Sequence, residues 1–249
     1  MNLESDILYL PTPPTAAEGR PLIPRYNASM NAPIGVLGGT FDPIHFGHLR
    51  LGEEAADHFG LARVHIIPAG DPYHRSPTVA SAQHRLAMVA IAVRNNPRLI
   101  ADGRELTRTG PSYTVDTLES LRAELGAAQP LVLLLGADAF IQMATWQRWQ
   151  AIFALAHVCV AERPGYSAWR AALPGDLREQ LGQRNLQGAC LPHQPAGSIL
   201  SFPLRPLDIS ASAIRALFRE GMSARYLLPS EVVAYIKLHD LYAAQAAIS

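Results

Sequence analysis

The sequence predicts an α/β fold in which a doubly wound parallel sheet is covered by helices on both faces. Apolar strand-like segments alternate with amphipathic helix-like segments from residue 34 onward, which is typical of such a sheet. The segment PLVLLLGAD (130–138) is apolar along nearly its whole length, as a parallel strand buried on both faces requires. With 249 residues, 49% of them hydrophobic and 17% charged, the chain can bury one substantial core.

The first half of the alternation begins with IGVLGGTF, a short apolar strand that ends in glycine. The helix after it places Leu49, Gly52, Ala56 and Phe59 on one face, and Gly126 stands where the third helix should end. The expected elements of this half are strands at 34–41, 63–69 and 98–103 and helices at 48–60, 81–95 and 112–125.

The second half contains three more apolar strands and ends in two helices, the last opened by Pro229 and Ser230 in helix-start positions. These elements are strands at 130–138, 156–165 and 198–204 and helices at 209–221 and 229–242. The order predicts a Rossmann-like sheet with a small C-terminal helical portion, all within one domain at 34–249. Ligands of such sheets bind beyond the carboxyl ends of the strands, where the strand order reverses.

Residues 1–33 contain six prolines and no helical or strand period, so we expect a mobile extension or a strap over the surface. The formal net charge of zero argues against a nucleic-acid partner. No basic leader and no run of about 18 apolar residues occurs, so we expect no membrane contact and a cytoplasmic location. The two cysteines form no CxxC, and Cys159 lies in a predicted buried strand.

The segment GGTFDPIHFGH (38–48) joins the first strand to the first helix and predicts a phosphate site. Neither GxGxxG nor the P-loop pattern is present. Gly38 and Gly39 nevertheless allow close backbone approach, and the helix start offers unpaired N–H groups. His45 and His48 can donate hydrogen bonds to phosphate oxygens, more strongly when protonated.

Two other interpretations of this histidine pair remain open. A zinc site would need further ligands, and HExxH is absent while Asp42 is the only nearby carboxylate. The histidines could instead be satisfied structural residues at a helix start.

The GGTFDPIHFGHL segment resembles the HxGH signature of the nucleotidyltransferase superfamily, and ISASAIR (209–215) resembles that superfamily's ISxTxIR motif. Ser212 stands where threonine is usual, which keeps the hydroxyl. Ser210 and Ser212 fall at a helix start, where hydroxyls and amides can face an anion, and Arg215 follows one turn later.

Segments between these motifs resemble bacterial nicotinate-nucleotide adenylyltransferases. They are IIPAGDPYHR, GPSYTVDTL, LLGADAFIQMATWQRW, AERPGY and LLPSEVVAYIKLHDLY, with Tyr73 and Glu162 departing from the family pattern. The resemblance covers residues 34–243 and leaves out the N-terminal extension. It implies transfer of AMP from ATP to nicotinate mononucleotide, giving nicotinate adenine dinucleotide and pyrophosphate, with Mg²⁺ carried on the ATP phosphates and no metal ligand from the protein.

The resemblance also implies roles for individual residues. His45, His48 and Arg215 would be catalytic. The ATP-binding residues would be Gly38, Gly39, Thr40, Phe41, His45, His48, Gly136, Asp138, Ile209, Ser212 and Arg215. The residues for nicotinate mononucleotide would be Thr114, Trp146, His74 and Arg75, with the Trp146 indole stacked on the ring.

Each of these residues also has a structural interpretation. Trp146 could be a core anchor, because Trp149 lies one turn away and the pattern does not separate the two. Asp138 and Thr114 could cap their helices, and His74 and Arg75 could be exposed loop residues. The rival functions are adenylyl transfer to nicotinamide mononucleotide or phosphopantetheine, a non-catalytic nucleotide sensor, and a zinc hydrolase.

Overall fold

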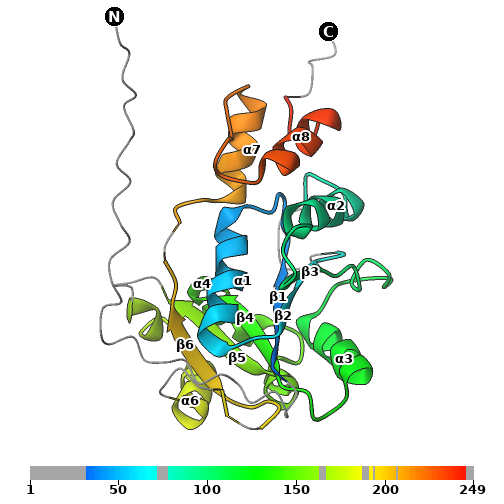
Figure 1. Cartoon of the computed structure of the whole chain (residues 1–249). Coiled ribbons are helices and arrows are strands. Elements are labelled where there is room, and N and C mark those ends of the chain that lie inside the picture. The colour runs from blue at the N-terminus through cyan, green and yellow to red at the C-terminus, as the bar shows by residue number, and fades with distance from the viewer. Residues whose placement is uncertain are drawn as a thin grey trace, which may run out of the picture.

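Six parallel strands form one sheet in the order β3-β2-β1-β4-β5-β6 (Figure 1). The computed structural model describes residues 32–71, 78–162, 167–186, 191–192, 194–205 and 207–244. The strands are β1 (Ile34–Gly39), β2 (Arg63–Pro68), β3 (Leu99–Ala101), β4 (Leu131–Gly136), β5 (His157–Glu162) and β6 (Ile199–Pro203). This sheet confirms the predicted fold class, while almost all of the predicted N-terminal extension lies outside the described residues.

The strand order reverses beside β1, where the candidate site begins. The chain runs outward through β2 and β3, then returns to place β4 on the other side of β1, so that Ile34 lies between Arg63 and Leu131. Beyond the carboxyl ends of β1 and β4 the connecting segments diverge to opposite faces. In an open parallel sheet this point leaves a crevice for a ligand.

Alternate residues of each strand feed two separate cores, one on each face. From β4, Leu134 joins the first core, whereas Leu133 and Leu135 join the second. The first core is covered by α1 (Phe46–Phe59), α2 (Ala82–Val93), α7 (Ala211–Arg219) and α8 (Ser230–Leu238). The second is covered by α3 (Thr114–Leu125), α4 (Ala137–Gln142), α5 (Ile152–Leu155) and α6 (Gly175–Arg184). Burial on both faces explains why most strand residues are apolar.

The C-terminal helices α7 and α8 lie together at one end of the molecule (Figure 1). Their connection meets the start of α1, since the Phe46 N–H donates to the Leu227 carbonyl at 3.0 Å. This contact brings the chain's end next to the loop after β1, although about 170 residues separate the two segments.

Several short elements were not predicted from the sequence. They are α4, α5, α6 and the 3₁₀ turns Met143–Thr145, Trp149–Ala151 and Ser167–Arg170. The helix α6 is polar, and Leu177 is its one buried residue, so it carries almost no periodic signal. The others span too few residues for a period to show.

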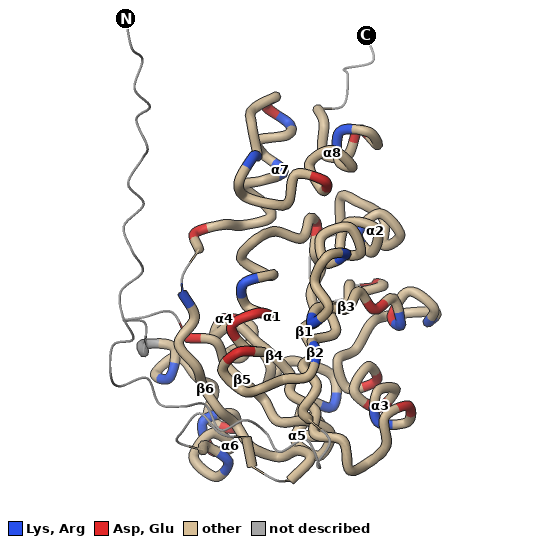
Figure 2. Tube along the Cα trace, in the orientation of Figure 1, with Lys and Arg blue, Asp and Glu red and all other residues tan. Residues whose placement is uncertain are grey.

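Basic and acidic residues are interspersed among the described elements (Figure 2), in keeping with the zero net charge. No helix among the described residues is both long and apolar enough to cross a bilayer. Cys159 is buried in β5 as predicted, and burial raises the pKa of its thiol.

Candidate active site

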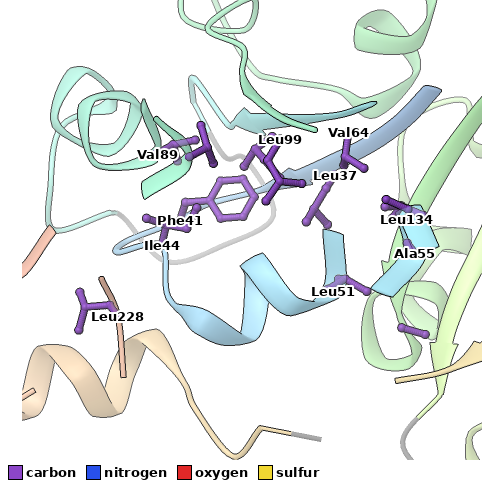
Figure 3. Close-up of a cluster of buried hydrophobic side chains, with 14 of the residues drawn as sticks. Leu37, Phe41, Ile44, Leu51, Ala55, Val64, Val89, Leu99, Leu134 and Leu228 are labelled. Atoms are coloured by element: carbon purple, nitrogen blue, oxygen red, sulfur yellow. The ribbon is translucent and has the colours of Figure 1, made fainter. Parts of the chain in front are cut away.

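The loop after β1 is held by Phe41, whose ring lies in the first core (Figure 3). A Cβ on Gly39 would come within 2.9 Å of that ring, so glycine is required there. Phe41 has a positive φ of 50°, and the edge of its ring meets the His48 ring at a centroid distance of 4.9 Å. Phe41 therefore fixes both the turn of the loop and one side of His48.

His45 and His48 lie side by side at the start of α1. Their rings stack at 3.7 Å with an interplanar angle of 24°. The His45 N–H donates to Nδ1 of His48 at 3.3 Å, so a neutral His48 carries its proton on Nε2. The pair thus presents two imidazole edges from one rigid helix start.

His45 is neutral in the free protein. Its side chain is buried, and loss of hydration lowers its pKa to about 4. Its Nδ1 is buried without a hydrogen-bond partner among the described residues. Neutrality also avoids placing two positive rings in stacking contact. A bound phosphate would favour protonation and would raise this pKa.

The second motif reaches the same place from the C-terminal helices. Ser210 caps α7, accepting from the Ala213 N–H at 3.2 Å, and its Oγ lies 3.3 Å from Oγ of Ser212. Arg215 Nη1 donates to the Asp42 carbonyl at 2.7 Å. The two motifs, far apart in the sequence, are therefore in direct contact.

A cavity of about 640 Å³ lies between the motifs, at the strand-order reversal. Its floor is formed by the ends of β1 and β4, and Ala211 closes it from the start of α7. The residues predicted for ATP that line it are Gly38, Gly39, Thr40, Phe41, His48, Gly136 and Arg215.

His45 and Ile209 line a separate recess of about 170 Å³ on another side of the histidine pair, and His48 lines both spaces. The Ser212 and Asp138 side chains are exposed and line neither space. His74 and Arg75 lie outside the described residues.

A third hollow, of about 150 Å³, adjoins the large cavity and shares the wall made by Gly38, Gly39 and Thr40. Thr114, the first residue of α3, and the half-buried Trp146 both line it. Trp149 instead packs edge-on against Phe153 in the second core. Tertiary structure thus separates the two tryptophans that the sequence pattern did not.

No group of three or more His, Cys, Asp or Glu side chains arranged to hold a metal occurs within the described ranges. The Asp42 carboxylate, the nearest acidic group to the histidines in the sequence, is already bound. It accepts from the Val79 and Ala80 N–H groups at 2.8 and 3.1 Å and from the Tyr242 hydroxyl at 2.6 Å.

Comparison with known proteins identifies the family. The cytidylyltransferase-like family profile matches residues 36–217. A Dechloromonas aromatica protein named "Probable nicotinate-nucleotide adenylyltransferase" is 51% identical over 216 residues, covering 86% of this chain and 99% of that relative. A Hahella chejuensis protein of the same name is 47% identical over 216 residues, covering 86% and 97%. The chain belongs to the nicotinate-nucleotide adenylyltransferase family.

The fold is also that of a solved structure, Plasmodium falciparum nicotinic acid mononucleotide adenylyltransferase complexed with NaAD. The TM-score is 0.63 at 16% sequence identity, and the match covers 85% of this chain and 97% of the other. At that identity the likeness concerns the fold alone.

One buried residue beside the candidate site, Arg85 on α2, was not predicted from the sequence. Its guanidinium donates to the Thr40 carbonyl at 2.7 Å, to Ala69 at 2.6 Å, to Gly70 at 3.2 Å and to Ala80 at 3.3 Å. It therefore clamps the loops after β1 and β2 together. The sequence does hold a signal, because Arg85 precedes the buried Met88 and Val89 by one helical turn.

Tyr242 is the second overlooked residue. Its hydroxyl is buried against the Asp42 carboxylate, and burial together with that charge raises the pKa of the phenol. Asp42, Arg85 and Tyr242 form a buried polar cluster that ties the segment after α8 to the loop after β1. Such contacts over 200 residues leave no local pattern.

Proposed function

We propose that this chain transfers the AMP group of ATP to nicotinate mononucleotide, forming nicotinate adenine dinucleotide and releasing pyrophosphate. Two relatives are named for this activity, and the chain matches 99% and 97% of their lengths. The observation that supports it best is the shared wall of Gly38, Gly39 and Thr40, which separates the motif-lined cavity from the hollow at Trp146. Two nucleotides placed in these spaces would meet at that wall.

The reaction joins two anions, so the protein's task is to position them and to offset charge. The mononucleotide phosphate attacks the α-phosphorus of ATP, the bond to the bridging oxygen breaks, and pyrophosphate leaves. The nucleophile is already ionised near neutral pH and needs no strong base. We assign charge stabilisation to His45, His48 and Arg215, aided by the Gly39 and Thr40 amides and the Ser212 hydroxyl.

The remaining predicted residues keep their proposed roles. Ile209, Phe41 and Gly38 border the ATP site, and Gly136 and Asp138 face its ribose region. Thr114 and Trp146 bind the nicotinate ring, and the part of His74 and Arg75 in substrate binding stays a prediction. Mg²⁺ fits as an ion carried on ATP, where it supplies charge neutralisation at the phosphates, because phosphate oxygens and water satisfy it without a protein cage.

Pyrophosphate release with ATP and Mg²⁺ tests the proposal when four acceptor conditions run in parallel: nicotinate mononucleotide, nicotinamide mononucleotide, 4′-phosphopantetheine and none. We expect rapid release with the first alone. Release only with another acceptor would keep the phosphate site and overturn the acceptor pocket. Release with none would favour the sensor, and zinc retained by the purified protein would favour the hydrolase.

A further inference from the structure

The hollow at Trp146 contains one ionisable side chain that has no role in the mechanism above. Among its described lining residues, Glu105 alone carries a charge, beside hydroxyls of Ser112, Thr114 and Thr117 and an apolar floor. Glu105 is buried, with 7% of its surface exposed. The proposed ligand of this hollow is an anionic nucleotide, which a carboxylate would repel. The presence of Glu105 in the lining therefore calls for an explanation.

The hydrogen bonds around Glu105 fix where its accepting oxygen points. Arg108 Nη1 donates to Thr117 Oγ1 at 3.0 Å, so the hydroxyl proton of Thr117 is directed elsewhere. It goes to Glu105 Oε1, at 2.6 Å. Ser112 Oγ, which also borders the hollow, accepts from the Gly70 and Asp71 N–H groups at 3.0 and 3.2 Å. Glu105 is thus held rigidly by partners that favour its accepting, ionised form.

No lysine, arginine or histidine nitrogen within the described ranges lies within 4.0 Å of this carboxylate. Arg85 is engaged by four carbonyl groups, and Arg108 donates to Thr117 and to the Asp116 carbonyl. Burial raises the pKa of Glu105, while hydrogen bonds from Thr117, Ser112 and Gly70 and the more distant Arg108 charge oppose that rise. A cation bound in the hollow would complete the carboxylate's environment.

The acceptor nucleotide supplies such a cation. The nitrogen of its pyridine ring is bonded to ribose, so the aromatic ring carries a positive charge beside its ring carboxylate. We propose, on the basis of the function assigned above, that Glu105 recognises this pyridinium charge and makes the pocket selective for the oxidised ring. The Trp146 indole adds cation–π attraction to the same charge, and Thr114 and the first amides of α3 receive the ring carboxylate.

The test compares nicotinate mononucleotide with its 1,4-dihydro form, which keeps the ribose, phosphate and carboxylate but lacks the ring charge. Binding of each is measured by titration calorimetry, independently of turnover. We expect the native protein to bind the oxidised form at least about tenfold more tightly, and Glu105→Gln to abolish most of that preference. Glutamine keeps nearly the same shape and the oxygen that accepts from Thr117, while the charge is lost.

Controls separate this role from a purely structural one. Glu179→Gln, at an exposed position of α6 that does not line the hollow, makes the same change in net charge and should bind like the native protein. Glu105→Gln should leave the KM for ATP within about twofold. A native protein without ring preference, or a Glu105→Gln protein that retains it, would overturn the inference. Either result would overturn the inference even if the pyrophosphate-release assay shows transfer of AMP to nicotinate mononucleotide. Use of a different acceptor in that assay would instead refute the proposed function.

Discussion

Replacing His45 with asparagine should flatten the loss of stability in acid. Asparagine is a favourable helix N-cap, so α1 should still begin at the same residue. The folded-state pKa of His45 is about 4, against 6.5 for an unperturbed imidazole. Below pH 6.5 the unfolded chain therefore binds a proton that the folded chain refuses. The free energy of unfolding is therefore independent of His45 protonation above pH 6.5, and it falls as the pH drops from 6.5 toward 4.

The magnitude follows from the two pKa values. Between pH 7 and pH 5 the native protein should lose about 2 kcal/mol of unfolding free energy through His45 alone. His58 and His157 also have lowered pKa values because of burial, so they add to the native slope. The difference between native protein and His45→Asn cancels their contribution and isolates one ring.

Urea unfolding at half-unit steps from pH 7 to pH 5 measures this difference. The two stability curves should converge as the pH falls, by about 2 kcal/mol over the range. His239→Asn makes the same substitution at an exposed imidazole and is the matched control. Parallel curves for native protein and His45→Asn would show that His45 is not held neutral by burial, and the electrostatic account of the site would fail.

Four further substitutions test the site and its surroundings. Trp146→Ala should raise the KM for nicotinate mononucleotide far more than that for ATP, while Trp149→Ala should cost about 3–5 kcal/mol of unfolding free energy; equal KM changes for Trp146→Ala would mark a structural residue. Arg85→Lys keeps the charge but loses the planar guanidinium that donates to four backbone carbonyls. Urea unfolding should show a loss of about 3 kcal/mol of unfolding free energy, and the enzyme assay should show a lower kcat. An unchanged kcat would contradict the role of Arg85 in holding the two loops together. Tyr242→Phe removes a donor to a buried carboxylate and should destabilise by about 2 kcal/mol in the same assay, and no change would mean that Asp42 is satisfied without it.

The fold could be predicted from the sequence because its signals are local. Burial of the strands on both faces makes β4 apolar along its length and β5 mostly so, and the glycines at 38 and 39 mark the end of β1. The same logic fails for α6, in which Leu177 is buried, Leu181 is partly buried and most other residues are polar. So few apolar positions produce no periodic pattern.

In the candidate site, too, residues that lie in local motifs could be predicted, and residues brought together by distant contacts could not. Its motifs could be read because the chemistry of phosphate binding needs glycines, imidazoles and a helix start within a few residues. Thr114 and Trp146 line one hollow, but only packing against Phe153 shows why Trp149 does not. The Asp42–Arg85–Tyr242 cluster depends entirely on tertiary contacts, so a sequence pattern gives its members no role.

The charges of the described site indicate that binding of ATP should be coupled to proton uptake and to binding of Mg²⁺. His45 is neutral, and the Arg85 guanidinium faces backbone carbonyls in the interior, so Arg215 is the one fixed cation among the described residues that line the large cavity. A single arginine cannot offset a triphosphate. In the proposed reaction the balance would come from amides, from Mg²⁺ carried on the phosphates and from protonation of the buried imidazole once an anion lies beside it. Calorimetry of ATP binding in buffers of different ionisation enthalpy should therefore show proton uptake near pH 6, and His45→Asn should remove it; uptake that persists in His45→Asn would place the proton on another group.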